Sequence, residues 1–256
     1  MGEPQTPLEA RFGRLRAAAR GDPMPGRELR LLRLASLERL LRHHADAICA
    51  AVSADFGQRS AHETRLLELF PSLEAIRHAR RHLWRWMRPQ RRPVSLWFQP
   101  ARAQVIHQPL GAVGIIVPWN YPIYLTVGPL VAALAAGNRA LVKMSELTPA
   151  TARLFAELVA QHFAADEVSV VEGGAEVAQA FSRLPFDRLL FTGSTAVGHR
   201  VMHAAAENLT PVILELGGKS PAIVGPGASL AQAAEDRKST RLNSSHIQKS
   251  RMPSSA

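Results

Sequence analysis

The amino-acid sequence predicts an α/β fold: a Rossmann-like, doubly wound parallel sheet with N-terminal helices and a protruding β-hairpin. Two patterns lead to this prediction. Leucines at helical spacing dominate the first part of the chain, and arginines fill many of the positions between them. From Ala112 onward, short apolar runs alternate with helical patterns, as in the repeated β-α units that build a parallel sheet.

The N-terminal helices come first along the chain. Residues 8–55 are predicted to be helical, and Phe56-Gly57 ends this region. A second helix is expected from about His62, with a kink at Pro71. Its predicted buried face consists of four apolar residues, namely Leu66, Leu69, Leu73 and Ile76.

A hairpin is expected next. Pro89 and Pro93 break the helical pattern. Residues 94–107 then resemble two short strands joined at Gln99-Pro100. A hairpin that protrudes from an α/β domain is a candidate for contact between subunits, so we expect the full-length protein to form a homodimer.

The α/β series follows the hairpin. Strands are expected at 112–117, 140–143, 168–171, 188–191 and 211–214. Helices are expected at about 126–136, 149–163, 176–182 and 196–207. Gly137-Asn138 is a C-cap signal, and Thr148-Pro149 supplies an N-cap and a proline at the first helical position. The uncharged stretch 108–138 holds four prolines, which favours strand, loop and buried helix over a membrane span.

The net charge of +10 suggests an anionic partner, but its distribution argues against one. Residues 1–102 carry 19 arginines, no lysine and 10 acidic residues, whereas residues 103–235 carry 7 basic and 10 acidic residues. The basic excess therefore lies at the two ends, largely on predicted helix faces. We expect no nucleic-acid or membrane partner. The N-terminus lacks the pattern of a signal peptide, so a cytoplasmic location is expected.

The cysteine count excludes two classes of site. One cysteine cannot form a disulfide framework or a cysteine-based zinc site. We predict no metal site.

Four loops follow predicted strands, at the edge where parallel sheets bind ligands. In the first, VPWNYP at 117–122, Asn120 offers a neutral amide that can stabilise an oxyanion without titrating. In the second, Lys143 ends a buried strand and Glu146 follows three residues later, so both can hold ribose hydroxyls. Lys143 is one of two lysines in residues 1–235.

The other two loops carry glycines. FTGSTAVG at 191–198 joins a strand to a helix whose N–H groups suit a pyrophosphate, although it matches neither G-x-G-x-x-G nor a P-loop. In LELGGKSP at 214–221, Glu215 follows an apolar strand. We expect this carboxylate to be partly desolvated, which favours action as a base. Each loop, taken alone, also fits a structural turn.

Together, PWNYP, VKMSE, FTGSTAVG and LELGGKSP resemble the aldehyde dehydrogenase superfamily in order and spacing, over about residues 8–235. The short N-terminal region and GAVGIIVPWNYP look like the class-3 branch, and the bacterial coniferyl aldehyde dehydrogenases in particular. The resemblance implies NAD(P)-dependent oxidation of a small-molecule aldehyde, and an aromatic aldehyde similar to coniferyl aldehyde is the candidate substrate. The product is the carboxylic acid, formed through a cysteine thiohemiacetal and thioester.

The resemblance also implies roles for individual residues. Asn120 would be the oxyanion donor and Glu215 the general base, while Lys143 and Glu146 would contact the adenosine ribose. Because Glu146 would repel a 2′-phosphate, NAD is favoured and NADP stays an alternative. Lys219 would be structural. The other expected cofactor-binding residues are Pro118, Trp119, Gly193, Ser194, Thr195 and Gly198.

One residue that is essential to catalysis in this superfamily is missing from the sequence. The family's cysteine nucleophile is expected near position 249, where this sequence has none. Residues 236–246, DRKSTRLNSSH, resemble a translated sequencing adapter, so we expect the native reading frame to end near Glu235 and the catalytic domain to be truncated. Cys49, in a predicted helix, is expected to be a buried apolar residue and no substitute. The chain is therefore expected to be inactive.

These inferences divide the chain into five parts. They are an N-terminal helical part at 1–90, a hairpin for oligomerisation at 91–107, an NAD(P)-binding α/β domain at 108–214, the start of the catalytic domain at 215–235, and a disordered, non-native tail at 236–256. Two other functions stay open. One is an acyl-phosphate-linked or acyl-CoA-linked reductase of the same superfamily. The other is a nucleotide-binding module without catalysis.

Overall fold

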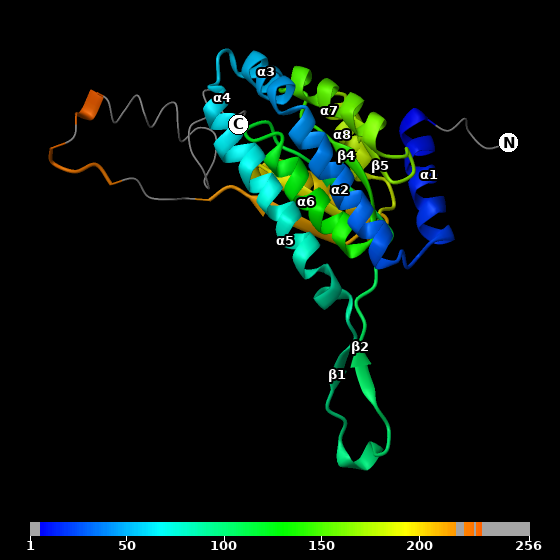
Figure 1. Ribbon diagram of the computed structural model, residues 1–256. Coiled ribbons are helices and arrows are strands. Elements are labelled where there is room, and N and C mark those ends of the chain that lie inside the picture. The colour runs from blue at the N-terminus through cyan, green and yellow to red at the C-terminus, as the bar shows by residue number, and fades with distance from the viewer. Residues whose placement is uncertain (1–5, 219–222, 228, 232–256) are drawn as a thin grey trace.

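The computed structural model describes residues 6–218, 223–227 and 229–231. The central element of this described part is a parallel sheet of five strands (Figure 1). The strand order is β5-β4-β3-β6-β7. The first strand of this sheet along the chain is β3, at the centre. The next two strands, β4 and β5, extend the sheet on one side of β3, and the last two, β6 and β7, extend it on the other side. This reversal is the mark of a doubly wound fold and confirms the predicted fold class. The bounds are β3 (Ala112–Ile116), β4 (Arg139–Lys143), β5 (Val168–Val171), β6 (Arg188–Gly193) and β7 (Val212–Leu216).

The N-terminal region predicted as helical from 8 to 55 consists of three helices. They are α1 (Pro7–Gly21), α2 (Arg27–His43) and α3 (Ala45–Phe56). Pro23 and Pro25 lie in the first break, where proline cannot donate the backbone hydrogen bonds of a continuing helix. Gly57 caps α3 with φ 61°, a left-handed conformation that suits glycine, as the sequence predicts.

The predicted helix from His62 is built in three pieces. They are α4 (Ala61–Thr64), the π-helical turn η1 (Arg65–Leu69) and α5 (Phe70–Met87). Pro71 lies in the first turn of α5, where proline is tolerated, so the predicted kink is replaced by the π-helical turn before it. The wider turn changes the rotation of the helix. As a result Leu66, predicted to be buried, is 64% exposed, whereas Glu68 lies in the core.

A two-stranded antiparallel arm projects from the end of α5 (Figure 1). Its strands are β1 (Gln90–Arg92) and β2 (Ala103–Val105), and a 3₁₀ turn, η2 (Leu96–Phe98), lies between them. The predicted hairpin is therefore confirmed, but its strands are shorter and lie farther from the tip than the sequence suggests. The apolar residues of VSLWF form the tip rather than a strand, because they find no partner strand there within the described residues.

The remaining helices agree closely with prediction. They are α6 (Tyr124–Ala136), α7 (Pro149–His162), α8 (Ala175–Ser182) and α9 (Thr195–Ala206). Gly137 caps α6 with φ 89°. The N-cap of α7 differs from prediction, because the Thr148 side chain does not cap the helix. Asp55 from α3 does so instead, accepting hydrogen bonds from the N–H groups of Ala150 (2.9 Å) and Thr151 (2.8 Å).

Alternate residues of the strands face two helical layers. Val113, Ile115 and Val142 pack in one apolar core with α2, α3, α5, α6 and α7. Ile116 and Leu141 pack in a second core with α1, α8 and α9. The sheet is thus covered on both faces, which explains why β3 and β4 are buried along their whole length.

No helix in the described part of the chain is long and apolar enough to cross a membrane. The uncharged stretch 108–138 forms β3, a loop and α6, as predicted. Residues 236–256, expected to be a disordered tail, lie outside the described residues. The division into five parts stays a prediction, and its boundary at 214–215 falls inside β7.

Candidate functional site

The loops that follow β3, β4 and β6 meet at one edge of the sheet, because these strands are parallel neighbours. Ile116, Lys143 and Phe191 stand side by side in the three strands. The Asn120 loop, here residues 117–122, follows β3, while Gly193 is the last residue of β6 and Ser194 follows it. The strand order reverses between β3 and β6, which is where doubly wound sheets bind ligands. The structure thus brings most of the predicted site residues together.

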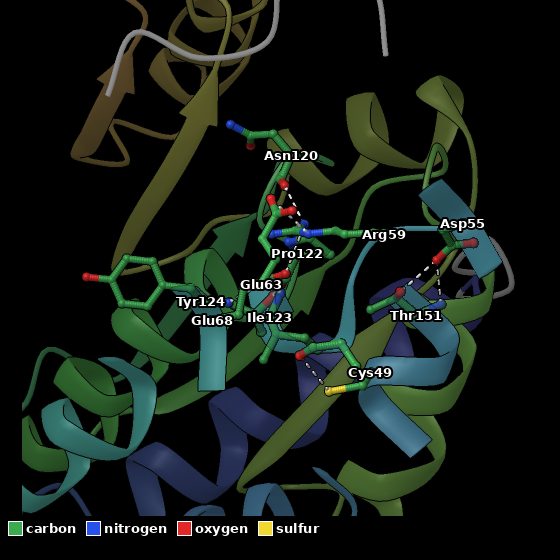
Figure 2. A network of polar contacts seen from close by, with 12 residues as sticks. Cys49, Asp55, Arg59, Glu63, Glu68, Asn120, Pro122, Ile123, Tyr124 and Thr151 are labelled. Carbon is green, nitrogen blue, oxygen red and sulfur yellow. Dashed lines mark hydrogen bonds and ion pairs between the residues drawn. The ribbon is translucent and has the colours of Figure 1, made fainter. Parts of the chain in front are cut away.

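The Asn120 loop is held from beneath by a buried arginine (Figure 2). Arg59, only 5% exposed, donates a hydrogen bond from Nη1 to the backbone carbonyl of Asn120 at 3.1 Å. Its guanidinium lies over the rings of Phe56 and Tyr121, at 5.0 and 4.7 Å from their centroids. Figure 2 shows the side-chain amide of Asn120 pointing away from Arg59, so Arg59 anchors the loop through its backbone.

Glu68 completes this anchor. Its Oε1 lies 3.1 Å from Nη1 of Arg59, and its Oε2 accepts hydrogen bonds from the N–H groups of Ile123 (2.7 Å) and Tyr124 (3.2 Å) at the start of α6. Glu68 is fully buried. Burial raises the pKa of Glu68 to about 7, although Arg59 and the two N–H groups act in the opposite direction.

Neither Arg59 nor Glu68 was predicted as a site residue from the sequence. An acidic residue within Leu66-Leu67-Glu68-Leu69 is an apparent break in an apolar run. That anomaly is the one signal in the sequence that points to a buried carboxylate.

Lys143 and Glu146 form a hydrogen-bonded ion pair. Lys143 is 2% exposed, and its Nζ donates to Oε2 of Glu146 at 2.9 Å and to the carbonyl of Met144 at 2.8 Å. Partial burial raises the pKa of Glu146, but the hydrogen bonds from Lys143 and from the backbone outweigh this effect, so the pKa lies below its ordinary value. The pair therefore presents a fixed cation and a partly exposed carboxylate at the end of β4.

The start of α9 offers backbone N–H groups at the same edge. Ser194 is its N-cap and accepts a hydrogen bond from the N–H of Val197 at 3.4 Å, and Thr195 begins the helix. A Cβ on Gly198 would lie 2.9 Å from Leu216, so glycine lets the first turn of α9 pack closely on β7. Together with Lys143, this donor set suits an anionic dinucleotide.

Glu215 differs from its prediction. It is exposed and lies inside β7 rather than after it. The expectation of partial desolvation is wrong, because β7 pairs only with β6 among the described residues and so forms an edge of the sheet. Lys219, expected to be structural, lies outside the described residues.

Cys49 is buried in α3, as predicted. Its Sγ lies 3.8 Å from the carbonyl of Ala61, and burial raises the pKa of the thiol. Figure 2 shows it away from the side chain of Asn120. A buried thiol with a raised pKa is a poor nucleophile.

Comparison with known proteins agrees with the fold and the motifs. The family model described as "Aldehyde dehydrogenase family" matches residues 22–244, which extends past Glu235. A probable coniferyl aldehyde dehydrogenase of Pseudomonas aeruginosa is 57% identical over 228 residues, covering 89% of this chain and 48% of the relative. A coniferyl aldehyde dehydrogenase of Pseudomonas sp. is 50% identical over 208 residues, covering 81% and 43%.

Solved structures show the same relationship. The substrate-bound state of AldH from Staphylococcus aureus superposes with a TM-score of 0.83 at 36% identity, covering 91% of this chain and 50% of that one. An aldehyde dehydrogenase of Mycobacterium tuberculosis, complexed with NAD+, gives 0.77 at 31% identity, covering 92% and 49%. This chain therefore spans about half the length of the relatives it matches. Because the family model matches most of its residues, the chain belongs to the aldehyde dehydrogenase family.

Proposed function

We propose that this chain carries the cofactor-binding region and the oxyanion loop of an NAD+-dependent aldehyde dehydrogenase that acts on aromatic aldehydes of the coniferyl type. One observation carries the proposal: Asn120, the Lys143–Glu146 ion pair and the start of α9 lie at the same sheet edge, where the strand order reverses. The substrate class comes from the names of the two Pseudomonas relatives.

The residues of the sheet edge fit a dinucleotide. Lys143 and Glu146 would hold the hydroxyls of the adenosine ribose. The N–H groups at Ser194 and Thr195 would face the pyrophosphate. Pro118 and Trp119, in the loop that follows the neighbouring strand β3, would also contact the cofactor. The carboxylate of Glu146 disfavours a 2′-phosphate by charge repulsion, so NAD+ is preferred to NADP+. When bound, the dinucleotide supplies a hydride acceptor.

The chain's own residues would serve the reaction in two ways. The amide of Asn120 would donate a hydrogen bond to the oxygen of the aldehyde as negative charge develops there. Glu215, exposed at the end of β7, would take a proton from water during release of the acid. The one cysteine in these 256 residues is buried in α3, so we propose that the polypeptide as given has no turnover.

We also propose that the whole protein forms a homodimer and is cytoplasmic. The arm exposes Leu96, Trp97 and Phe98, a cluster of large apolar side chains that favours pairing of two copies of the whole protein. The single free, buried cysteine accords with a cytoplasmic location.

Calorimetric titration of the purified chain with NAD+ and NADP+ tests the cofactor proposal. Binding of NAD+ should be stronger than binding of NADP+. Lys143→Met should weaken it at least about tenfold, because a buried charged hydrogen-bond donor is lost. Arg85→Met is the matched control, since it removes an exposed positive charge near the end of α5, by the arm, and should leave affinity unchanged. A folded chain that binds neither dinucleotide would refute the proposal.

A second assay tests the chemistry. With coniferyl aldehyde and NAD+, the 256-residue chain should form no NADH above a blank without protein. Appreciable NADH formation would show that the 256-residue chain reacts without an accessible cysteine nucleophile. That result would overturn the proposal that this chain has no turnover.

A further inference from the structure

The Asn120 loop leaves the sheet at Val117, whose N–H donates to the carbonyl of Lys143 in β4 at 3.0 Å, and its next residues contact the helical layer. The carbonyl of Asn120 accepts from Arg59, and Tyr121 packs under the same guanidinium. Trp119, one residue earlier, packs on Phe56 with ring centroids 6.1 Å apart, and Phe56 is the other ring that Arg59 covers. Three consecutive residues of the loop are thus organised around one buried arginine.

The arginine in turn depends on Glu68. A buried guanidinium needs a counter-charge, and Glu68 supplies it at 3.1 Å. The second oxygen of the same carboxylate binds Ile123 and Tyr124, the residues at which the loop becomes α6. Glu68 therefore holds the loop at two points: directly where α6 begins, and through Arg59 at the carbonyl of Asn120.

We propose that Arg59 and Glu68 are positioning residues that hold the Asn120 loop in the conformation needed for oxyanion stabilisation, and that the negative charge of Glu68 is required for this. This inference rests on the proposed function, since it gives the loop a purpose only if Asn120 is the oxyanion donor. Neither residue reaches the reacting atoms. Both act through the backbone and through Trp119.

The charge of Glu68 can change near neutral pH. Burial raises the pKa of Glu68 to about 7, so protonation would weaken both the ion pair and the acceptor for two N–H groups. The other groups that face it are Arg59, Glu63 and Cys49, with Tyr121 close by. Burial raises the pKa of Tyr121 to about 12 and that of Cys49 above its ordinary value, so neither accounts for a transition near pH 7.

Trp119 provides the reporter. The other three tryptophans, Trp84, Trp86 and Trp97, are exposed, so they can be replaced by phenylalanine together to leave Trp119 as the single fluorophore. In this background the emission of Trp119 should change with a midpoint near pH 7. Over the same pH range, amide exchange at Ile123 and Tyr124, corrected for its intrinsic pH dependence, should accelerate about five- to tenfold on acidification, as a charge-assisted hydrogen bond becomes a neutral one.

Glu68→Gln and Glu63→Gln form a matched pair of variants. Both residues lie near Arg59, but Glu63 is 3.5 Å from its Nε and its side chain is 28% exposed, whereas Glu68 is fully buried and also accepts the hydrogen bonds from Ile123 and Tyr124. Glu68→Gln should show no pH transition and should resemble the acidified wild-type chain at all pH values. Glu63→Gln should keep the transition. A folded Glu68→Gln chain with an unchanged transition and unchanged amide exchange would overturn the proposal.

Two further measurements cover the case in which Glu68→Gln does not fold. In the wild-type chain, carbon-13 NMR can follow the carboxyl group of Glu68 directly. If Trp119, Ile123 and Tyr124 do not respond while Glu68 titrates, the proposal is wrong. Arg59→Lys should keep most of the pH-dependent change in Trp119 emission, because lysine keeps the positive charge, whereas Arg59→Met should lose it. Equal changes in the two variants would also contradict the proposal. These measurements use neither aldehyde nor cofactor. They can therefore contradict the role of Arg59 and Glu68 while NAD+ binding is observed, or support that role while NAD+ does not bind.

Discussion

At the scale of single residues, three buried charged side chains lie behind the sheet edge: Arg59, Glu68 and Lys143. Burying a charge is costly unless it is paired, and each of these has a partner. Lys143 could be predicted from the sequence, because lysine is rare in this chain and this one ends an apolar strand. Arg59 was not predicted, because it lies in the link between two predicted helices, where a charged residue ordinarily faces solvent. Glu68 interrupts an apolar run, but the π-helical turn that buries it has no sequence signature.

Glu68→Gln should change how stability depends on pH. The folded state holds the pKa of Glu68 at about 7, above its value of 4.5 in an unfolded chain, so the folded chain binds more protons between these values. The contribution of Glu68 to stability is therefore full below pH 4.5 and declines as the pH rises through about 7, by up to about 1 kcal/mol per pH unit. Glutamine cannot titrate, so urea denaturation at a series of pH values should show this component missing in the variant. Parallel stability curves for the two chains would contradict it.

Lys143→Met should raise the pKa of Glu146 toward its ordinary value. Hydrogen bonds from Lys143 and from the backbone now lower that pKa, against the effect of partial burial. Methionine fills a similar volume without charge, so the fold should persist. Carboxyl NMR titration of Glu146 measures the change, and an unaltered titration curve would mean that the ion pair does not form in solution.

At the scale of elements, the sheet and its helices were predictable and the N-terminal helices only partly so. β5 has the predicted bounds, and α6 to α9 differ from theirs by one or two residues, because each apolar run is closed by glycine, proline or a polar turn. The region 8–55 was predicted without internal breaks, although Pro23 and Pro25 separate α1 from α2. The strands of the arm were placed too far toward its tip, because Leu96, Trp97 and Phe98 have strand-forming character but no neighbouring strand within the described residues.

Asp55→Ala should destabilise the chain through the start of α7. Asp55 accepts two backbone hydrogen bonds there and a third from the hydroxyl of Thr151 at 2.6 Å. Loss of a helix N-cap costs about 1 to 2 kcal/mol. Urea denaturation measures the cost. Asp46→Ala on the same helix is the control, because Asp46 is highly exposed and pairs only with Arg65 at the surface, which is worth less than about 1 kcal/mol. Equal effects of the two substitutions would argue against the cap.

At the scale of the whole molecule, the order of the strands decides what the sequence could reveal. The loops after β3, β4 and β6 were predicted as one site, and the strand order brings them together. The exposure of Glu215 was not predicted, because it follows from the position of β7 at the edge of the sheet among the described residues. A local apolar pattern does not distinguish an edge strand from a central one.

Trp97→Ser should reduce self-association of the chain. Trp97 is 91% exposed at the tip of the arm, beside Leu96 and Phe98, and a solvent-exposed apolar cluster of this kind favours contact with a second copy. Light scattering after size exclusion measures the mass. Trp84→Ser, on α5 and also exposed, is the control and should leave the mass unchanged. The same mass for the wild-type and Trp97→Ser chains would rule out the arm as the contact.

The central claim is that a dinucleotide binds where the loops after β3, β4 and β6 meet. Hydrogen exchange of the chain with and without NAD+ tests it most directly. The account predicts slower exchange in three segments, 117–121, 143–146 and 192–198, and little change in α2 and α5. Protection confined to other parts of the chain, or no protection at saturating NAD+, would contradict it.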